Sequence, residues 1–530
     1  MAAADPRTND FDTRTDTPAR VQRVTTEAIA DCIGTLECLL SQPDALAQIP
    51  AELRRQLLIV AGKLSRPLRH ERERVTKAIR RYRRDVEGDA DFRLRQTTQI
   101  RDGRIVASED SECLPDHSEV QQTPSHAPKQ GARRLNQPQS CYICKCDYVE
   151  LHHFYDALCP ACAEFNFRKR TQTAPLEGRI ALVTGARIKI GFHIALMLLR
   201  AGARVIATTR FPNDAAARFS RESDYEQWRE RLTLYGLDLR YCPVVEQFAD
   251  HLLSTLPHLD FLINNAAQTV QRPPGYYLHL HAGEERPFSE LPAVQQALLF
   301  NHHELQLKGA TGGGRATAST PRLATHLELA TFGADPQVGN DQGPSDFEDP
   351  VNFPLGRLDA DGQQLDLRRV NSWRLRAADV KTPELIEVHL VNAIAPFILV
   401  SRLKALMGKH PTGDRHVVNV SAMEGVFARR TKTDKHPHTN MAKASLNMLT
   451  RTSAADYVRA GIHMNSVDTG WVTDEDPHPD AVRKRRDYDF SPPLDAIDGA
   501  ARVCDPIFSG FLTGEHQYGQ FFKDYRPSEW

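Results

Sequence analysis

The sequence predicts an α/β protein in which a doubly wound parallel sheet follows an N-terminal helical region and a small zinc-binding module. The sheet is predicted because, from about residue 173 onward, short apolar runs alternate with helical patterns, as in strands joined by crossover helices. The helical region is predicted by apolar residues at helical spacing, such as Ile29, Ile33, Leu36 and Leu40. The module is predicted by two Cys-x2-Cys pairs that lie between these regions.

Composition sets the segment boundaries along the chain of 530 residues. A stretch rich in Ser, Pro, Gln and Asp separates the helical region from the cysteine pairs, which is typical of a linker. The predicted order is disorder over residues 1–20, a helical region over 21–105, a linker over 106–138, a zinc-finger-like module over 139–172 and the sheet domain over 173–530.

Charge and hydropathy restrict the class of protein. The formal net charge is −1 and 41% of the residues are hydrophobic, which indicates a globular protein without a global field for nucleic acid. No run of about 18 apolar residues and no apolar N-terminal signal core are found, so we expect a cytoplasmic protein that does not span a membrane. Nine Lys or Arg residues between Arg66 and Arg84 are interleaved with Glu71 and Glu73, which favours a solvated helix face over a nucleic-acid site.

The cysteine pairs predict a structural metal site. Cys141 and Cys144 form one knuckle, and Cys159 and Cys162 form the other. Two such pairs close a tetrahedral zinc site and leave no position for a catalytic water. A redox dithiol needs only one pair, and reduced cysteines without metal are a second alternative. Three nearby side chains are alternative ligands: Cys146, His152 and His153.

The run "IALVTGARIKIGFHIALMLLRAG" predicts a buried strand, a tight turn and a helix. A glycine at the strand end permits a sharp turn, and the N-terminus of the helix that follows offers free N–H groups to a pyrophosphate. The turn of a Rossmann-type dinucleotide-binding domain has this form. Its candidate cofactor-binding residues are Thr184, Gly185, Arg187, Lys189, Ile190 and Gly191.

This turn resembles that of the short-chain dehydrogenase/reductase family, whose fingerprint is TGxxxGxG. Thr184, Gly185 and Gly191 match it, whereas Lys189 replaces the middle glycine. The replacement places a cation, with Arg187 nearby, where the family binds phosphates. Further motifs keep the family's order from about residue 176 to residue 524.

The resemblance implies which residues hold the cofactor. In "LYGLDLR", Asp238 matches the aspartate that helps to hold the adenine, and "NNAA" places Asn264 and Ala266 at the family's NNAG motif. The second strand ends without an acidic residue that would accept the ribose hydroxyls of NAD, and Arg210 lies there instead. A guanidinium suits a 2′-phosphate, so we expect NADP rather than NAD.

The resemblance also implies a catalytic set with one member missing. Asn392, Ser421 and Lys443 match the family's asparagine, serine and lysine, and the lysine also bonds the nicotinamide ribose. Thr439 stands where the family has its tyrosine. An aliphatic hydroxyl is a poor acid at neutral pH, because even a phenol with a pKa of ~10 needs a nearby cation to titrate near 7. His438 is a candidate proton donor, since imidazole titrates in the required range; His436, Lys443, a water, Tyr276 and Tyr277 are others.

The family has a few dozen residues between the segments that match Ala267 and Asn392, whereas this chain has 124. The long insertion, at about 270–382, is predicted to be a substrate lid, a partner surface or a tolerated loop.

Three functions follow from these motifs. The first is an NADP(H)-dependent oxidoreductase that acts on an unknown carbonyl or alcohol substrate with a non-standard proton donor. The second is a catalytically inactive NADP(H)-binding sensor or scaffold, and the third is a protein-interaction platform. The N-terminal helices are a candidate binding surface for a protein partner. The resemblance to the family makes a homo-oligomer a further possibility.

Overall fold

The computed structural model describes residues 25–65, 82, 86, 88–101, 133–311, 351–359, 361–429 and 432–530. The disorder predicted for residues 1–20, most of the basic stretch at 66–84 and the Gly-rich part of the insertion lie outside the described residues. Contacts divide the chain into two units, Met1–Val86 and Glu87–Trp530.

The first unit contains three helices within the predicted helical region. They are α1 (Thr26–Ser41), α2 (Pro43–Gln48) and α3 (Ala51–Ser65). Thr25 caps α1, because its hydroxyl accepts the backbone N–H of Ala28 at 3.2 Å. The helices leave large apolar side chains in solvent, and Leu40 and Leu64 are 82% and 83% exposed.

An eight-stranded sheet forms the centre of the second unit, in the order β10-β9-β8-β7-β6-β3-β4-β5. Every pairing is parallel except that of β10 with β9. The central strands are buried along their whole length, as expected for a parallel sheet covered on both faces. The predicted doubly wound α/β fold is therefore confirmed. The strands are β3 (Ile180–Thr184), β4 (Arg204–Thr209), β5 (Leu232–Gly236), β6 (Phe261–Asn264), β7 (Arg415–Ser421), β8 (Ile462–Asp468), β9 (Phe521–Lys523) and β10 (Arg526–Ser528).

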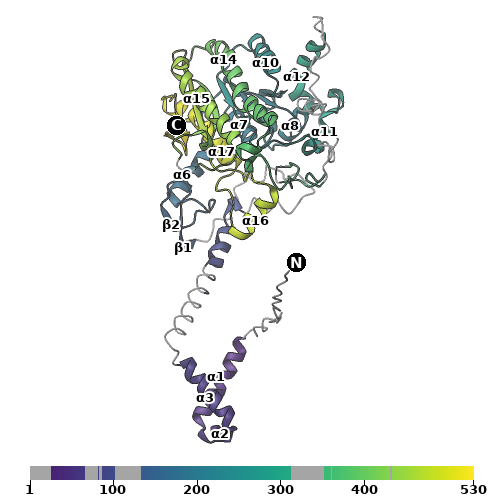
Figure 1. The fold of residues 1–530 in the computed structure, drawn as a ribbon. Coiled ribbons are helices and arrows are strands. Elements are labelled where there is room, and N and C mark those ends of the chain that lie inside the picture. Colours follow the sequence, from purple (N-terminus) through teal and green to yellow (C-terminus); the bar gives the residue numbers. More distant parts are fainter. Residues whose placement is uncertain are drawn as a thin grey trace, which may run out of the picture. The chain divides into compact units, whose positions relative to one another are not determined.

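Helices cover both faces of this sheet (Figure 1). One apolar cluster joins the sheet to α7 (Lys189–Arg200), α8 (Pro212–Phe219), α12 (Ala293–Thr311) and α17 (Ala496–Thr513). A second joins it to α10 (Cys242–Thr255), α14 (Ala395–Gly408) and α15 (Pro437–Val458).

The run Thr382–Gly408 is long and apolar enough to cross a membrane, with a mean hydropathy of 1.6 over its most apolar window. The expectation that no such run exists was therefore too strict. Leu399, Leu403 and Leu406 of this run are fully buried in the cluster on the sheet. These leucines pack in the core of the domain, whereas Ile394 and Phe397 of the same run are exposed.

Part of the insertion is ordered next to the carboxyl ends of the strands. Its elements include η3 (Pro274–Tyr277), α11 (Leu278–Glu284), η4 (Phe288–Glu290), η6 (Ser372–Arg374) and η7 (Ala377–Asp379), and α13 (Thr382–His389) follows it. Tyr276, Tyr277 and Phe353 form an apolar cluster with Phe211, which lies two residues after the end of β4. The insertion is therefore packed against the end of the sheet.

The cysteine-rich module consists of β1 (Arg134–Ser140), β2 (Asp147–Glu150) and α6 (Pro160–Arg170). The predicted linker over 106–138 extends too far, because β1 begins at Arg134. The polar composition of this strand resembles a linker, but its order comes from pairing with β2. The carboxylate of Asp91 also accepts the backbone N–H groups of Asn136 and Gln137 at 2.8 and 3.0 Å.

The module packs on the sheet domain through buried polar and apolar contacts. The Tyr155 hydroxyl donates to Asp498 of α17 at 2.5 Å, and Arg170 pairs with Asp495 at 2.7 Å. Val472 and Leu494 of the sheet domain belong to the apolar cluster of the module. The module and the sheet domain therefore share one core.

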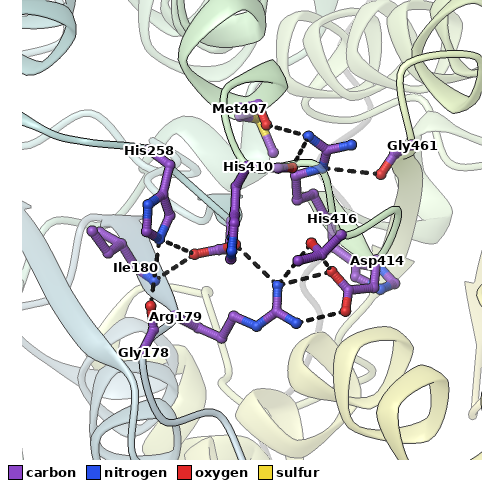
Figure 2. Close-up of polar contacts among 12 residues, drawn as sticks. Gly178, Arg179, Ile180, His258, Met407, His410, Asp414, His416 and Gly461 are labelled. Atoms are coloured by element: carbon purple, nitrogen blue, oxygen red, sulfur yellow. Dashed lines mark hydrogen bonds and ion pairs between the residues drawn. The ribbon is translucent and has the colours of Figure 1, made fainter.

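At the amino ends of the strands, a buried carboxylate organises a polar network (Figure 2). Asp260 is fully buried and accepts the backbone N–H of Ile180 at 2.8 Å. Arg179 donates to it at 3.1 Å, and His410 Nδ1 and His258 Nε2 lie 2.7 and 3.2 Å from its oxygens. The carboxylate is therefore contacted by four donors from three segments of the chain, because Arg179 and Ile180 are neighbours in the sequence.

Candidate active site

A cavity of about 1100 Å³ lies at the carboxyl ends of the parallel strands. It is lined by residues that directly follow β3, β4 and β6, and by the last residues of β7 and β8. Ligands of doubly wound sheets bind at this edge, where loops diverge from the strand ends. Residues of α15, of the insertion and of the cysteine-rich module complete the lining.

The turn between β3 and α7 has the backbone of a close-packed glycine turn. Gly185 has a φ of +68°, and a Cβ there would lie 2.8 Å from the Cα of Ala266. A Cβ on Gly191 would overlap the carbonyl oxygen of Gly185. Lys189 has a φ of +54°, so it adopts the left-handed conformation that the family's middle glycine would adopt without strain. The lysine preserves the shape of the turn at a cost of roughly 1–2 kcal/mol.

The two cations of this turn are engaged by other residues. Arg187 is buried and donates to Asp214 at 2.7 Å and to Gln363 of the insertion at 2.6 Å. Lys189 Nζ lies 3.6 Å from the carboxylate of Asp361, which also belongs to the insertion. Burial favours the neutral amine, but nearby carboxylates outweigh it and raise the pKa of Lys189. The cations therefore join the turn to the insertion and line the cavity.

Arg210 lies at the end of β4, where the sequence predicts a 2′-phosphate contact. It lines the cavity and donates to the Tyr277 hydroxyl at 2.7 Å. Asp238 also lines the cavity, and its carboxylate is paired with Arg240 at 2.5 Å. Burial opposes ionisation of Asp238, but the bonds to Arg240 outweigh it and lower its pKa. This wall therefore contains a half-buried guanidinium that is hydrogen-bonded to a hydroxyl and lies near the Asp238 carboxylate.

Thr184 and Asn264, two predicted cofactor residues, lie inside the sheet and not among the residues that line the cavity. The Thr184 hydroxyl accepts the backbone N–H of Ala266 at 3.0 Å, and the Asn264 amide donates to Asn419 at 2.8 Å. Asn265 lines the cavity instead, and its amide donates to the carbonyl of Gly185 at 3.1 Å. Asn264 therefore bonds within the sheet, whereas Asn265 holds the backbone of the glycine turn.

Ser421, Thr439 and Lys443 line the same cavity and are almost fully buried. Lys443 Nζ donates to the carbonyl of Val420 at 2.7 Å. Burial lowers the pKa of Lys443 to about 8, although Glu424 and Asp468 oppose this effect. The hydroxyls of Ser421 and Thr439 have no hydrogen-bond partner among the described residues. Two buried polar groups are therefore left for a ligand to satisfy.

Asn392 and His438 lie outside the lining of the cavity. Asn392 belongs to a π-helical turn, η8 (Leu390–Ile394), and its side chain holds the backbone of Gln268 through bonds of 2.6 and 3.0 Å. His438 Nε2 lies 3.3 Å from Glu384 of α13. The structure therefore places His438 away from the reacting groups, contrary to the proton-donor hypothesis.

His436 is the histidine that reaches the cavity. Its φ of +42° turns the chain into α15, which begins at Pro437. Its ring stacks on Trp373 of the insertion, with ring centres 3.8 Å apart, and its Nδ1 lies 3.1 Å from Asn440 Oδ1. The insertion therefore covers the start of the helix that carries Thr439 and Lys443.

The sequence reasoning did not identify two other residues that line the cavity, Asp468 and Tyr142. Asp468 is the last residue of β8 and is 7% exposed. Tyr142 belongs to the cysteine-rich module, and its hydroxyl accepts the backbone N–H of Trp471 at 3.0 Å. An acidic residue at the end of the apolar run "IHMNSVD" was the available signal for Asp468. No local pattern indicates that Tyr142 reaches this domain.

The four predicted metal ligands come together in the module. One ligand sulfur from each of Cys141, Cys144, Cys159 and Cys162 lies within 4.8 Å of the other three. The sulfurs of Cys144 and Cys159 are 3.7 Å apart, which matches the edge of a tetrahedron with metal–sulfur bonds of ~2.3 Å. A backbone hydrogen bond from Cys146 lowers the pKa of Cys144 to about 6, whereas burial raises the pKa of Cys159 and Cys162.

Comparisons with known proteins agree with this architecture. A family model described as short chain dehydrogenase matches residues 179–280, and one described as enoyl-(acyl carrier protein) reductase matches residues 370–485. The two matches flank most of the insertion.

Similar proteins extend these matches. The uncharacterized protein R665 of Acanthamoeba polyphaga mimivirus is 31% identical over 379 residues, which are 69% of this chain and 71% of that protein. Dehydrogenase/reductase SDR family member 13 of Bos taurus is 42% identical over 95 residues, or 18% of this chain and 24% of that protein. A short chain dehydrogenase of Burkholderia cenocepacia, solved in complex with NADP, is 18% identical with a TM-score of 0.39, and the match covers 66% of this chain and 96% of that one.

Proposed function

Because this chain belongs to the short-chain dehydrogenase/reductase family, we propose that it is an NADP(H)-dependent oxidoreductase that acts on a carbonyl or an alcohol. One observation carries the proposal: the glycine turn, Ser421 and Lys443 line a single cavity at the carboxyl edge of the sheet. Fold alone does not imply an activity, but a collinear set of reactive groups in one cavity does support one.

The cavity fits a dinucleotide on the evidence of its own residues. The glycine turn leaves no room for a Cβ at Gly185 or Gly191, and the N-terminus of α7 follows it. Arg210 supplies a guanidinium for a 2′-phosphate, and β4 ends without an acidic residue that would favour NAD. When bound, the dinucleotide supplies or accepts a hydride. Lys443 would hold the nicotinamide ribose, and the Ser421 hydroxyl would donate to the oxygen of the substrate.

Thr439 favours a second candidate, an NADP(H)-binding sensor or scaffold that does not catalyse hydride transfer. Its hydroxyl is not an acid that titrates near neutral pH. This candidate shares the cofactor site with the first and differs only in turnover. A binding assay together with a turnover assay therefore separates the two.

The binding assay titrates NADPH and NADH against the protein and follows the nicotinamide fluorescence. We expect tighter binding of NADPH, and Arg210→Asp should weaken NADPH at least ~10-fold more than NADH, because a charge-assisted bond to phosphate is lost. Arg229→Asp, at an exposed arginine of the same domain, is the matched control. Equal weakening of both nucleotides by Arg210→Asp would contradict the phosphate assignment.

The turnover assay follows nicotinamide absorbance with a panel of aldehydes, ketones and alcohols. Oxidation of NADPH that depends on the carbonyl supports the oxidoreductase. Tight binding of NADPH without turnover of any member of the panel would favour the sensor.

We further propose that the four cysteines hold a structural Zn²⁺ ion. Four thiolates at tetrahedral spacing are a donor set typical of zinc and leave no open position. Elemental analysis of the purified protein should find about one zinc per chain. Cys159→Ser should lower this value and destabilise the module, whereas Cys242→Ser, outside the cluster, should leave it unchanged. Folded protein that is free of metal would contradict the proposal.

A further inference from the structure

We propose that Asp468 exchanges the proton at the substrate oxygen, in the role that the family gives to the tyrosine replaced here by Thr439. This inference rests on the proposed oxidoreductase function and assigns a catalytic residue to it. It is carried by the position of Asp468, by its lack of an ion-pair partner and by the engagement of the other candidates.

The first observation is position. Asp468 is the last residue of β8 and pairs in register with Ser421, the last residue of the neighbouring strand β7. Paired residues on neighbouring strands lie about 4.8 Å apart, so the carboxyl group starts next to the serine that would hold the substrate oxygen. Asp468, Ser421 and Thr439 line the same cavity.

The second observation is the absence of a neutralising partner. Two other acidic residues of the lining are paired, Asp238 with Arg240 and Asp476 with Arg374. Asp468 forms no ion pair with any described residue, and its Oδ1 accepts one long hydrogen bond, of 3.3 Å, from the backbone N–H of Met423. The charged form of a carboxyl that is 7% exposed is therefore poorly compensated.

The surroundings of Asp468 raise the pKa of its carboxyl group toward neutral pH. Glu424 of η9 (Met423–Gly425) and Asp524 disfavour its charge, whereas Lys523 and the N–H of Met423 favour it. Burial has the largest effect, and together these groups raise the pKa of Asp468 to about 6. Lys443 of α15 and Tyr142 of the module complete the ionisable groups around it. An acid with a pKa near the working pH is well suited to general acid–base catalysis.

Most other candidates are engaged or poorly tuned, and Lys443, whose Nζ donates to the carbonyl of Val420, is assigned to the nicotinamide ribose. Glu424 is paired with Arg429 at 2.6 Å, and His436 is stacked on Trp373. Burial raises the pKa of Tyr276 to about 12, which is the opposite of the change that a catalytic phenol needs. His438 lies outside the lining.

The proposed step is the reduction of a carbonyl with a proton from Asp468. In the reducing direction, a hydride from the reduced nicotinamide bonds to the carbonyl carbon, and the electron pair of the C=O π bond moves to the oxygen. That oxygen takes the carboxyl proton of Asp468, and Ser421 donates a hydrogen bond to it. The products are the alcohol, the oxidised nicotinamide and the Asp468 carboxylate, which regains a proton from water.

The first test measures the carboxyl group itself in the ligand-free protein. Infrared difference spectra between the wild-type protein and Asp468→Asn, recorded from pH 4 to pH 8, should show a protonated carboxyl band that disappears with a midpoint near 6. A band that is absent above pH 5 would overturn the inference, whatever the catalytic activity.

The second test measures turnover at pH 6 with NADPH and the best carbonyl substrate of the panel. Asp468→Asn should lower kcat by ~10²–10⁴-fold and change the NADPH affinity less than ~3-fold, because a general acid contributes to the chemical step and not to cofactor binding. Asp468→Glu should recover part of the loss. Asp456→Asn, an exposed carboxylate on the same helix as Lys443, is the matched control and should keep the wild-type kcat.

The outcomes separate the two proposals. If the wild-type protein turns over and Asp468→Asn retains its kcat, the role of Asp468 is overturned while the oxidoreductase stands. If the wild-type protein binds NADPH and reduces no carbonyl, the oxidoreductase is overturned, and the role of Asp468 is overturned with it.

Discussion

The Asp260 carboxylate at the amino edge of the central sheet and three polar side chains at the carboxyl edge differ in how their hydrogen-bonding groups are satisfied. At the amino edge, the Asp260 carboxylate meets four donors from three segments of the chain. The donors belong to Arg179, Ile180, His258 and His410, which are labelled in Figure 2. At the carboxyl edge, the hydroxyls of Ser421 and Thr439 have no partner among the described residues, and Asp468 has no ion pair with any of them.

This difference separates groups that stabilise the fold from groups that are available to a ligand. A buried polar group without a partner costs about 1–3 kcal/mol, so a protein that keeps several in one cavity loses stability there. Both edges are built from the same strands, so the difference does not come from the sheet itself. It identifies the carboxyl edge as the place where a substrate or cofactor would supply the missing bonds.

The largest expected effect tests the saturated edge. Asp260→Ala removes the acceptor of Arg179, His258, His410 and the Ile180 N–H together, so it should lower the free energy of unfolding by about 3–5 kcal/mol. Urea denaturation at pH 7 measures this loss. NADPH affinity of the folded variant should not change. A loss below about 1 kcal/mol would mean that the network is not structural.

The second effect is a pH dependence at the unsaturated edge. The folded pKa of Asp468, about 6, exceeds the ordinary value of 3.8, so the native state binds the proton more tightly than the unfolded state. This group therefore reduces stability progressively as the pH rises from about 4 to about 6, by about 3 kcal/mol in total. The stability of Asp468→Asn relative to the wild-type protein should rise over the same range and then stay constant. Urea midpoints at pH 4, 5, 6 and 7.5 test this, and a constant difference would contradict it.

A smaller effect distinguishes two buried serines. The Ser421 hydroxyl is unpaired, whereas the Ser466 hydroxyl lies 2.8 Å from that of Thr450. Ser466→Ala should lower the free energy of unfolding by about 1 kcal/mol, because it removes a paired group. Ser421→Ala should leave stability unchanged or raise it by up to about 1 kcal/mol, while turnover falls. Equal losses in the two variants would show that the Ser421 hydroxyl contributes to stability as a paired group does.

The smallest expected change in the free energy of unfolding is that of an exposed ion pair, and it serves as a baseline for the other variants. Lys404 and Asp456 form a pair on the surface of the domain, where solvent screens the charges. Lys404→Ala should change the free energy of unfolding by less than about 0.5 kcal/mol, and less at high salt. A larger change would show that exposed charges contribute to the stability differences measured above.

The fold class could be predicted from the sequence because the strands of a parallel sheet are continuous apolar runs. "IALVT" and "FLIN" are fully buried, as their composition indicates. Strand β1 was missed because its order depends on Asp91 and β2 and not on its own composition.

The candidate site could be predicted in part. Ser421 and Lys443 keep the family's spacing, and the structure brings both to the cavity. The choice of His438 as proton donor is not supported, because the left-handed backbone of His436 sets the start of α15 and directs His438 toward Glu384. The pairing of Lys189 with Asp361 depends on a contact across 172 residues, which no local pattern reveals.

The hydrogen bond between Tyr142 and the backbone of Trp471 has a thermodynamic consequence for the whole domain. Tyr142, next to Cys141 of the cysteine cluster, supports a wall of the cavity that would hold the dinucleotide. If zinc and nucleotide both favour the arrangement in which this wall is formed, their binding is coupled, and the coupling is reciprocal. Each would then raise the affinity of the other by the same factor, so saturation with NADPH would slow the loss of zinc to a chelator.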